Sequence, residues 1–187
     1  MIAVDPSANV LRNEFARERV QARLEEYAPG PVFDLATLRM VVEHVDAPDA
    51  FARALAGAMR PGGMVVIFTV NRWAPITLVS GVVPFRFHHA LKRVVWGGDE
   101  EDTFPVCYLL NTRATLQRTL APHGLREAAF ARLDDLSTFG TFPRLGGIEL
   151  AAWRAMRSLA LPYPESCLLG IYVKDGAPAV AQSERAK

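Results

Sequence analysis

The chain has 187 residues, half of them hydrophobic, and its 21 Lys and Arg residues nearly balance its 20 Asp and Glu residues. Because a domain has on the order of 150 residues, this length predicts a single domain. The net charge of +1 excludes a strongly basic nucleic-acid-binding protein, and the apolar content excludes a chain that is disordered throughout. The two cysteines, Cys107 and Cys167, are too few for a disulfide framework or a four-ligand zinc site.

The sequence shows no pattern of a targeting or membrane segment. Its first residues have neither the charged start nor the long apolar core of a signal peptide. The longest clean apolar run, residues 64–68, is far shorter than the roughly 20 residues of a membrane-spanning helix. We therefore expect a cytoplasmic protein with reduced cysteines.

Strand patterns recur through the first 70 residues. Residues 2–4 have the pattern of a short buried strand, and residues 20–24 alternate between apolar and polar side chains, which indicates a second strand. A third buried strand is predicted over residues 33–38. Residues 64–70 are apolar on both faces, which is typical of a central parallel strand.

A helix is predicted between the last two of these strands. Asp46 is expected to cap its N-terminus, with Pro48 in the first turn, and the glycines of residues 60–63 are expected to stop it. Its apolar stripe recurs at every fourth position, at Phe51, Leu55 and Met59. The alternation of strands and connections predicts an α/β fold with a parallel sheet.

Residues 72–98 contain no Asp or Glu, and basic and aromatic residues are interleaved along them. We expect a partly helical insertion here, followed by a solvated acidic loop at residues 99–102. The adjacent His88 and His89 would point about 100° apart on a helix, which is poor geometry for chelation. No metal site is therefore predicted.

The C-terminal half continues with alternating helices and strands. A helix is predicted to begin at Asn111 and Thr112 and to end at Gly124, and a strand is predicted at residues 128–133. An amphipathic helix is predicted over residues 148–159, with one face formed by Ile148, Ala152, Ala155, Met156 and Leu159.

The last predicted strand, residues 167–173, contains Cys167 as a core residue. With the strand at residues 128–133 it is expected to form a closing, hairpin-like pair at a sheet edge. Residues 175–187 have no apolar period and are predicted to be a disordered tail, so residues 1–174 form the predicted domain.

The run FDLATLRMVVEHV at residues 33–45, the capped helix and the run RPGGMVVIF at residues 60–68 resemble class I S-adenosylmethionine-dependent methyltransferases, in their small-molecule, type 11-like branch. The resemblance covers residues 2–174. It implies a Rossmann-like sheet in which residues 2–4 are the family's second strand and residues 33–38 its fourth. The implied strand order is third, second, first, fourth, fifth, seventh, sixth, with the last strand antiparallel.

The family's first strand and its glycine-rich loop, which wraps the methionine part of the cofactor, have no counterpart in the sequence. The first glycine is Gly30, and no two glycines are separated by a single residue. We therefore expect a sheet that lacks its first strand, with an apolar seam exposed at the gap and with residues 71–98 as a helical cap. The expected explanation is an N-terminal truncation. The chain would then be a fragment, a sequence whose start codon was assigned too far downstream, or a degenerate relative.

The resemblance assigns cofactor contacts to three segments. Asp5 would accept hydrogen bonds from the ribose hydroxyls, although a simple turn-forming Asp has the same pattern. Residues Arg23, Leu24 and Glu25 lie where the family holds adenine, or else form an exposed strand end. Leu38 and Arg39 follow the fourth strand, at the crevice where open α/β sheets bind ligands. Arg39 would meet a carboxylate there or form a surface salt bridge.

His44 is the candidate catalytic residue, as a general base or as a wall of the substrate pocket. The alternative for His44 is a packed, hydrogen-bonded histidine under the strand. Methyl transfer from an activated sulfonium depends mainly on alignment, so the absence of an obvious base does not argue against it.

The sequence thus predicts methyl transfer from S-adenosylmethionine to a small-molecule acceptor, with weak or no cofactor binding by this chain because the glycine-rich loop is missing. No nucleic acid is expected as a partner. The cap is expected either to pack on the domain or to admit an apolar or anionic acceptor, including one from a membrane surface that it contacts transiently. In the second case Trp73, Phe85, Phe87 and Trp96 would be the apolar contacts, and Lys92 and Arg93 would attract anionic lipid. The alternative function is a non-catalytic relative that acts as an interaction or regulatory module. The absence of G-x-G-x-x-G argues against a nicotinamide oxidoreductase.

Overall fold

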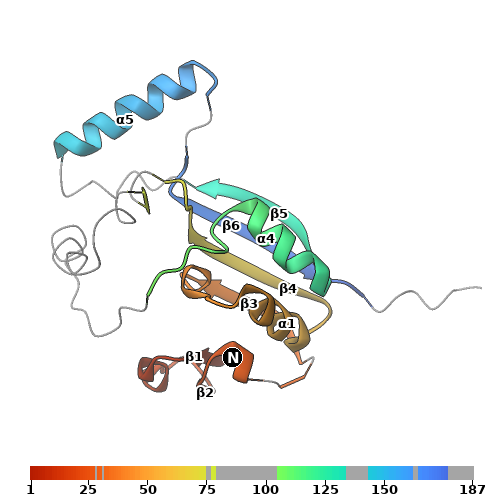
Figure 1. The fold of residues 1–187 in the computed structure, drawn as a ribbon. Coiled ribbons are helices and arrows are strands. Elements are labelled where there is room, and N and C mark those ends of the chain that lie inside the picture. The colour runs from red at the N-terminus through yellow and green to blue at the C-terminus, as the bar shows by residue number, and fades with distance from the viewer. Residues whose placement is uncertain are drawn as a thin grey trace, which may run out of the picture.

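The computed structural model of the protein describes residues 1–27, 29–30, 32–74, 77–78, 105–133, 143–161 and 164–176. Most of the predicted cap, the acidic run at residues 99–102 and the tail beyond residue 176 lie outside these ranges, and so does the predicted His88–His89 pair. The described strands form two separate hydrogen-bonded sheets (Figure 1).

The larger sheet has four strands in the order β3-β4-β6-β5. These strands are β3 (Phe33–Arg39), β4 (Met59–Val70), β5 (Leu125–Leu133) and β6 (Cys167–Lys174). Strand β3 is parallel to β4, and β6 lies between β4 and β5 and is antiparallel to both. The predicted antiparallel pair at the sheet edge is therefore confirmed.

The smaller sheet consists of β1 (Ile2–Asp5) and β2 (Glu18–Gln21), which are parallel. It has no hydrogen-bonded pairing with β3, although Figure 1 shows it on the β3 side of the larger sheet. The larger sheet has the order predicted for the family's fourth, fifth, seventh and sixth strands, and the smaller sheet pairs the predicted second and third strands. The prediction that the sheet would not close its own gap is thus confirmed for the described residues.

The predicted bounds of two strands in the first 70 residues were wrong. The second strand ends at Gln21, three residues before its predicted end. The predicted last residue, Leu24, instead begins the short 3-10 helix η2 (Leu24–Glu26). Strand β4 begins at Met59, so the glycines at residues 60–63 lie inside the strand and do not precede it. A register irregularity opposite Phe33 and Leu35 accommodates these extra residues. Gly62 has a φ of +79°, a conformation that favours glycine.

Helices α1 (Pro48–Ala58) and α4 (Arg113–Leu120) cover one face of the larger sheet (Figure 1). Helix α4 starts where predicted, and Thr112 caps it, since its hydroxyl accepts a hydrogen bond from the Thr115 N–H. The short helix η4 (Ala121–His123) follows and ends at Gly124, whose φ is +75°. The predicted cap of α1 was wrong: the N-cap position is Ala47, and Asp46 instead forms an ion pair with Arg23.

The core lies between this face and the two helices. Its buried residues from the sheet, α1 and α4 include Leu38, Val65, Ile67, Tyr172, Phe51, Leu55, Leu116 and Leu120. On β3, next to the gap, Leu35 is 57% exposed, and its register partner Met64 is 40% exposed. By the alternation of strand side chains, Leu35 and Met64 lie on the face of the sheet opposite the core. The apolar seam at the position of the first strand stays a prediction.

The late helix α5 (Pro143–Ser158) begins five residues before its predicted start. The apolar face predicted for it is exposed to solvent: Ile148 is 67% exposed and Leu159, just after the helix, is 68% exposed. Figure 1 shows α5 away from the sheet. No helix in the described ranges is long and apolar enough to cross a membrane.

Candidate functional site

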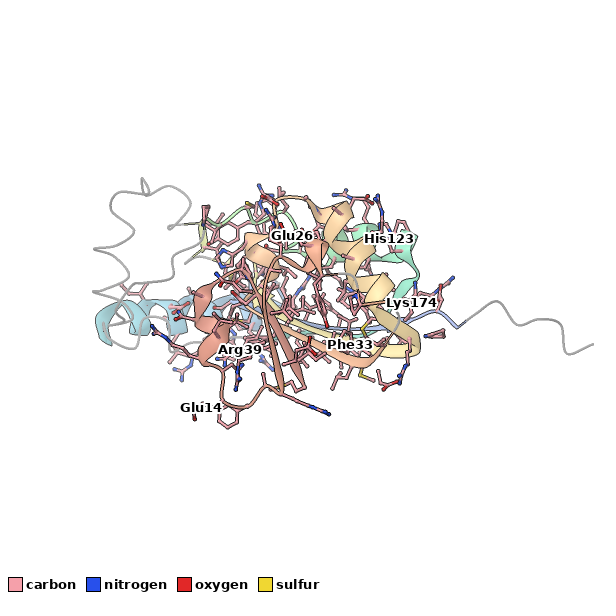
Figure 2. All side chains as sticks on the ribbon, turned by 90° about the horizontal axis from the view of Figure 1, so that it is seen from below. Glu14, Glu26, Phe33, Arg39, His123 and Lys174 are labelled. Atoms are coloured by element: carbon pink, nitrogen blue, oxygen red, sulfur yellow. The ribbon has the colours of Figure 1, made fainter. Side chains whose placement is uncertain are left out.

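The carboxyl end of β3 is the first part of the candidate site. Leu38 is buried in the core, so its side chain is turned away from solvent, whereas Arg39 is exposed. Met40 follows with a φ of 52°, and its N–H donates to the Phe68 carbonyl at 2.9 Å. Figure 2 shows Arg39 at the opposite end of β3 from Phe33, while Lys174 and His123 lie towards the Phe33 end.

Arg39 forms no ion pair among the residues that the structure describes, so the predicted surface salt bridge has no partner there. Its guanidinium is left for solvent or for an anionic ligand. An arginine at this position is suited to a carboxylate, because its planar fork of N–H donors matches the two oxygens.

Asp5 is the last residue of β1, and its Oδ1 accepts a hydrogen bond of 2.7 Å from the Ser7 N–H. Asp5 therefore stabilises the turn that follows β1. Oδ1 is the only carboxylate oxygen of Asp5 that accepts a hydrogen bond within the described chain, so Oδ2 is left to accept others. A turn and a ligand contact are compatible at this residue.

The adenine-side candidates lie on η2 and just before it. The side chain of Arg23 binds Asp46, and it also lies 3.8 Å from Glu25 Oε1. The hydrogen bond with Asp46 and the attraction between the two charges raise the pKa of Arg23, and the same hydrogen bond lowers the pKa of Asp46. Leu24 packs against the core. Arg23 and Leu24 thus fix η2 beside α1, which leaves the η2 backbone and Glu25 for ligand contacts.

A buried polar network, which the sequence patterns did not reveal, joins the ends of β3 and β4. Glu43, on η3 (Val42–His44), is only 5% exposed, and its Oε2 accepts a hydrogen bond from Thr69 Oγ1 at 2.9 Å. Asn111 Nδ2 donates to Thr69 Oγ1 and to the Val70 carbonyl, both at 2.9 Å. The Glu43 carbonyl accepts from the Cys107 N–H at 2.7 Å. The network holds the segment before α4 against the end of the sheet.

His44 takes part in the same arrangement. Its Nδ1 lies 3.0 Å from the Pro105 carbonyl, in hydrogen-bonding geometry. This contact supports the packed, hydrogen-bonded alternative for His44. The catalytic role of His44 stays a prediction.

A cleft of about 870 Å³ lies between the end of β4 and the first turn of α4. None of the residues predicted to bind the cofactor or to act in catalysis lines it, whereas Trp73, predicted as an apolar contact of the acceptor, does. Its walls are Asn71, Arg72 and Trp73 after β4, residues 112–115 and Gln117 at α4, Arg132 on β5, and Pro164, Glu165 and Leu168 around the start of β6. The position of Asn71–Trp73 directly after a predicted central strand was the one sequence signal that could have indicated this wall.

Asn71 holds two walls of this cleft together. Its side-chain Nδ2 donates to the Glu165 carbonyl at 2.8 Å, and its backbone N–H donates to the Ser166 carbonyl at 2.8 Å. Its Oδ1 accepts from the Trp73 N–H at 3.1 Å. The loop after β4 and the segment before β6 are therefore joined at the carboxyl end of β4.

Comparison with known proteins identifies the family. A family model described as a methyltransferase domain matches residues 1–127, which is more than half of the chain. The chain belongs to this methyltransferase family. The predicted class I S-adenosylmethionine-dependent methyltransferase and its Rossmann-like α/β fold are therefore confirmed.

Proteins similar to this chain are also methyltransferases. A ubiquinone biosynthesis O-methyltransferase from Bradyrhizobium sp. (strain ORS 278) is 34% identical over 87 residues, which are 42% of this chain and 34% of that protein. The aligned part thus spans about a third of the length of this relative.

Two solved structures show the same fold. A methyltransferase structure from Archaeoglobus fulgidus has a TM-score of 0.53 at 16% identity, covering 92% of this chain and 75% of the other. The N-methyltransferase NodS from Bradyrhizobium japonicum, in complex with S-adenosyl-L-homocysteine, has a TM-score of 0.50 at 11% identity, with coverages of 92% and 65%.

Proposed function

We propose that this protein transfers a methyl group from S-adenosylmethionine to the oxygen of a small-molecule acceptor. The observation that carries the proposal is the topology of a chain of the methyltransferase family, in which β1 pairs with β2 and β3 begins a separate sheet of order β3-β4-β6-β5. In open α/β sheets, ligands bind at the carboxyl ends of the strands where the order reverses. The name of the O-methyltransferase relative supports oxygen as the methylated atom.

The described residues fit S-adenosylmethionine in part. Asp5 Oδ2 suits the ribose hydroxyls, the η2 backbone with Glu25 suits adenine, and Arg39 suits the carboxylate of the methionine part. When bound, the cofactor supplies a methyl group on an already activated sulfonium. The protein then has to align that group with the acceptor and exclude water.

The sequence lacks two glycines separated by a single residue, which would let a backbone loop approach the methionine part closely. We therefore propose that the 187-residue chain binds the cofactor weakly or not at all. We expect that a version of the protein extended upstream by a strand and a glycine-rich loop would have its added strand between β1 and β3 and would bind the cofactor tightly.

Isothermal titration of S-adenosylmethionine into both versions tests this proposal. Weak binding by the 187-residue chain and tight binding by the extended protein are expected. In the extended protein, Asp5→Ala should weaken binding about tenfold, since a charged hydrogen-bond acceptor is removed. Asp34→Ala is the matched control, because Asp34 is exposed on β3 and pairs with Arg60 away from the site.

Two results would contradict the proposal. Tight, stoichiometric binding by the 187-residue chain would show that another segment replaces the glycine-rich loop. No binding and no methyl transfer by the extended protein would favour the second candidate function, a non-catalytic interaction or regulatory module. The exposed Leu35 and Met64 favour this second candidate, because a partner protein could cover that apolar face.

A further inference from the structure

Two arginine side chains that line the cleft beside α4 have no charged partner in the described part of the chain. Arg72 follows β4 and Arg132 lies near the end of β5, and both line the cleft. Neither guanidinium forms an ion pair or a side-chain hydrogen bond with the described residues. The two charges are therefore free to meet a ligand.

Arg113, the third arginine of the cleft wall, is already neutralised. Its Nη2 lies 2.5 Å and its Nε 3.0 Å from Glu127 Oε1, and its Cζ lies 5.1 Å from the centre of the Phe130 ring. Among the described lining residues, the one carboxylate is that of Glu165. The lining groups thus carry a net positive charge once the Arg113–Glu127 pair is set aside.

Two other features suit a small anion with an apolar part. The first turn of α4 lines the cleft and contains no acidic residue, so the partial positive charge of the helix N-terminus is not offset there. Trp73 is 58% exposed on the wall, with Arg72 Cζ 5.8 Å from its ring centre. The volume of about 870 Å³ is in the range of small-molecule sites.

We propose that this cleft binds the anionic group, a carboxylate or a phosphate, of a small acceptor through Arg72 and Arg132, with Trp73 against the acceptor's apolar part. Guanidinium groups bind such oxyanions through paired N–H donors, which gives both affinity and orientation. The inference rests on the proposed function only where it names this molecule as the methyl acceptor. Binding itself requires no cofactor.

Calorimetric titration of the 187-residue chain, without S-adenosylmethionine, tests the inference with three aromatic probes. Benzoate and phenyl phosphate carry the two anionic groups, and benzyl alcohol is their neutral counterpart. At least one anion is expected to bind about tenfold more tightly than benzyl alcohol, and the tighter anion identifies the preferred group. Equal affinity for all three probes, or no binding of either anion, would overturn the inference.

Charge-neutralising variants locate the site. Arg72→Gln and Arg132→Gln should each weaken binding of the preferred anion about fivefold, and Glu165→Gln should strengthen it because it removes a repelling charge. Arg118→Gln is the control, since Arg118 is an exposed arginine of α4 that does not line the cleft. Equal weakening by Arg118→Gln and Arg72→Gln would show a nonspecific effect of net charge and overturn the assignment.

Failure of this inference and failure of the proposed function are separable. The proposed function alone would be contradicted if the chain binds anions in a charge-dependent way but its extended form neither binds S-adenosylmethionine nor transfers methyl groups. The anion site alone would be contradicted if the extended form transfers methyl groups but Arg72→Gln and Arg132→Gln leave its affinity for the anions unchanged.

Discussion

Thr69 donates a buried hydrogen bond of 2.9 Å to Glu43 and thereby joins η3 to the end of β4. The hydroxyl oxygen of Thr69 in turn accepts from Asn111 Nδ2 at 2.9 Å. The Thr69 hydroxyl thus donates to a buried carboxylate and accepts from a buried amide at the same time. Buried polar groups that lose such partners are costly, so this network helps to determine the shape of the sheet's carboxyl end.

Thr69→Val should reduce the free energy of unfolding by about 1–3 kcal/mol, because it preserves the side chain's shape but leaves Glu43 Oε2 without its donor and removes one of the two acceptors of Asn111 Nδ2. Urea denaturation measures the effect. The control is Thr37→Val on the exposed face of β3, which should change the free energy by less than about 0.5 kcal/mol. Equal effects of the two substitutions would show that the network does not contribute to stability.

Tyr172→Phe should leave the stability unchanged or raise it by up to about 1 kcal/mol. The Tyr172 hydroxyl is buried without a hydrogen-bond partner among the described residues, and burial raises its pKa so that it stays protonated. Phenylalanine removes this buried polar group at little change in shape. A clear loss of stability in thermal or urea unfolding would show that the hydroxyl has a partner.

Gly170→Ala should destabilise the protein by about 1–3 kcal/mol through overpacking. A Cβ at this position would lie 2.7 Å from Cε2 and 3.0 Å from Oη of Tyr172. The same substitution in a Tyr172→Leu background should be much less destabilising, because the ring is gone. If Gly170→Ala lowers the free energy of unfolding equally in both backgrounds of this double-mutant cycle, the strain lies in the backbone of β6 and not against the Tyr172 ring.

Leu116→Ala and Ile148→Ala should differ strongly, although both remove an apolar side chain from a helix. Leu116 is fully buried under α4, so its loss should reduce the free energy of unfolding by about 2–5 kcal/mol. Ile148 is exposed on α5, and its loss should change the free energy by less than about 0.5 kcal/mol. A large effect of Ile148→Ala would mean that the apolar face of α5 packs on the domain.

Arg23→Gln should return the pKa of Asp46 towards the ordinary aspartate value of about 3.9. The folded-state pKa of Asp46 is lowered, so its pairing with Arg23 stabilises the fold above the ordinary value and is lost as the pH falls through the lowered value. NMR titration of the Asp46 carboxyl carbon measures the shift. Arg53→Gln is the control, since Arg53 pairs with Asp49 and should leave Asp46 unchanged.

Much of the local structure could be predicted from the sequence. The helix start at Thr112 and the stop at Gly124 were correct, because a capping hydroxyl and a positive φ act within a few residues. The strands at residues 33–38 and 167–173 were predicted within one residue of their ends, since a buried strand needs a continuous apolar run. Asp46 was wrongly assigned as a cap, because its actual partner, Arg23, lies on another element.

By itself, the sequence determined the elements, the family and the absence of a glycine-rich loop, since each depends on residues that are close together in the chain. Tertiary structure alone decided that Glu43 is buried against Thr69, that the apolar face of α5 is exposed, and that Arg72 and Arg132 share a cleft. These relationships join residues far apart in sequence. Burial and charge at such sites depend on which elements pack together, and no local pattern contains that information.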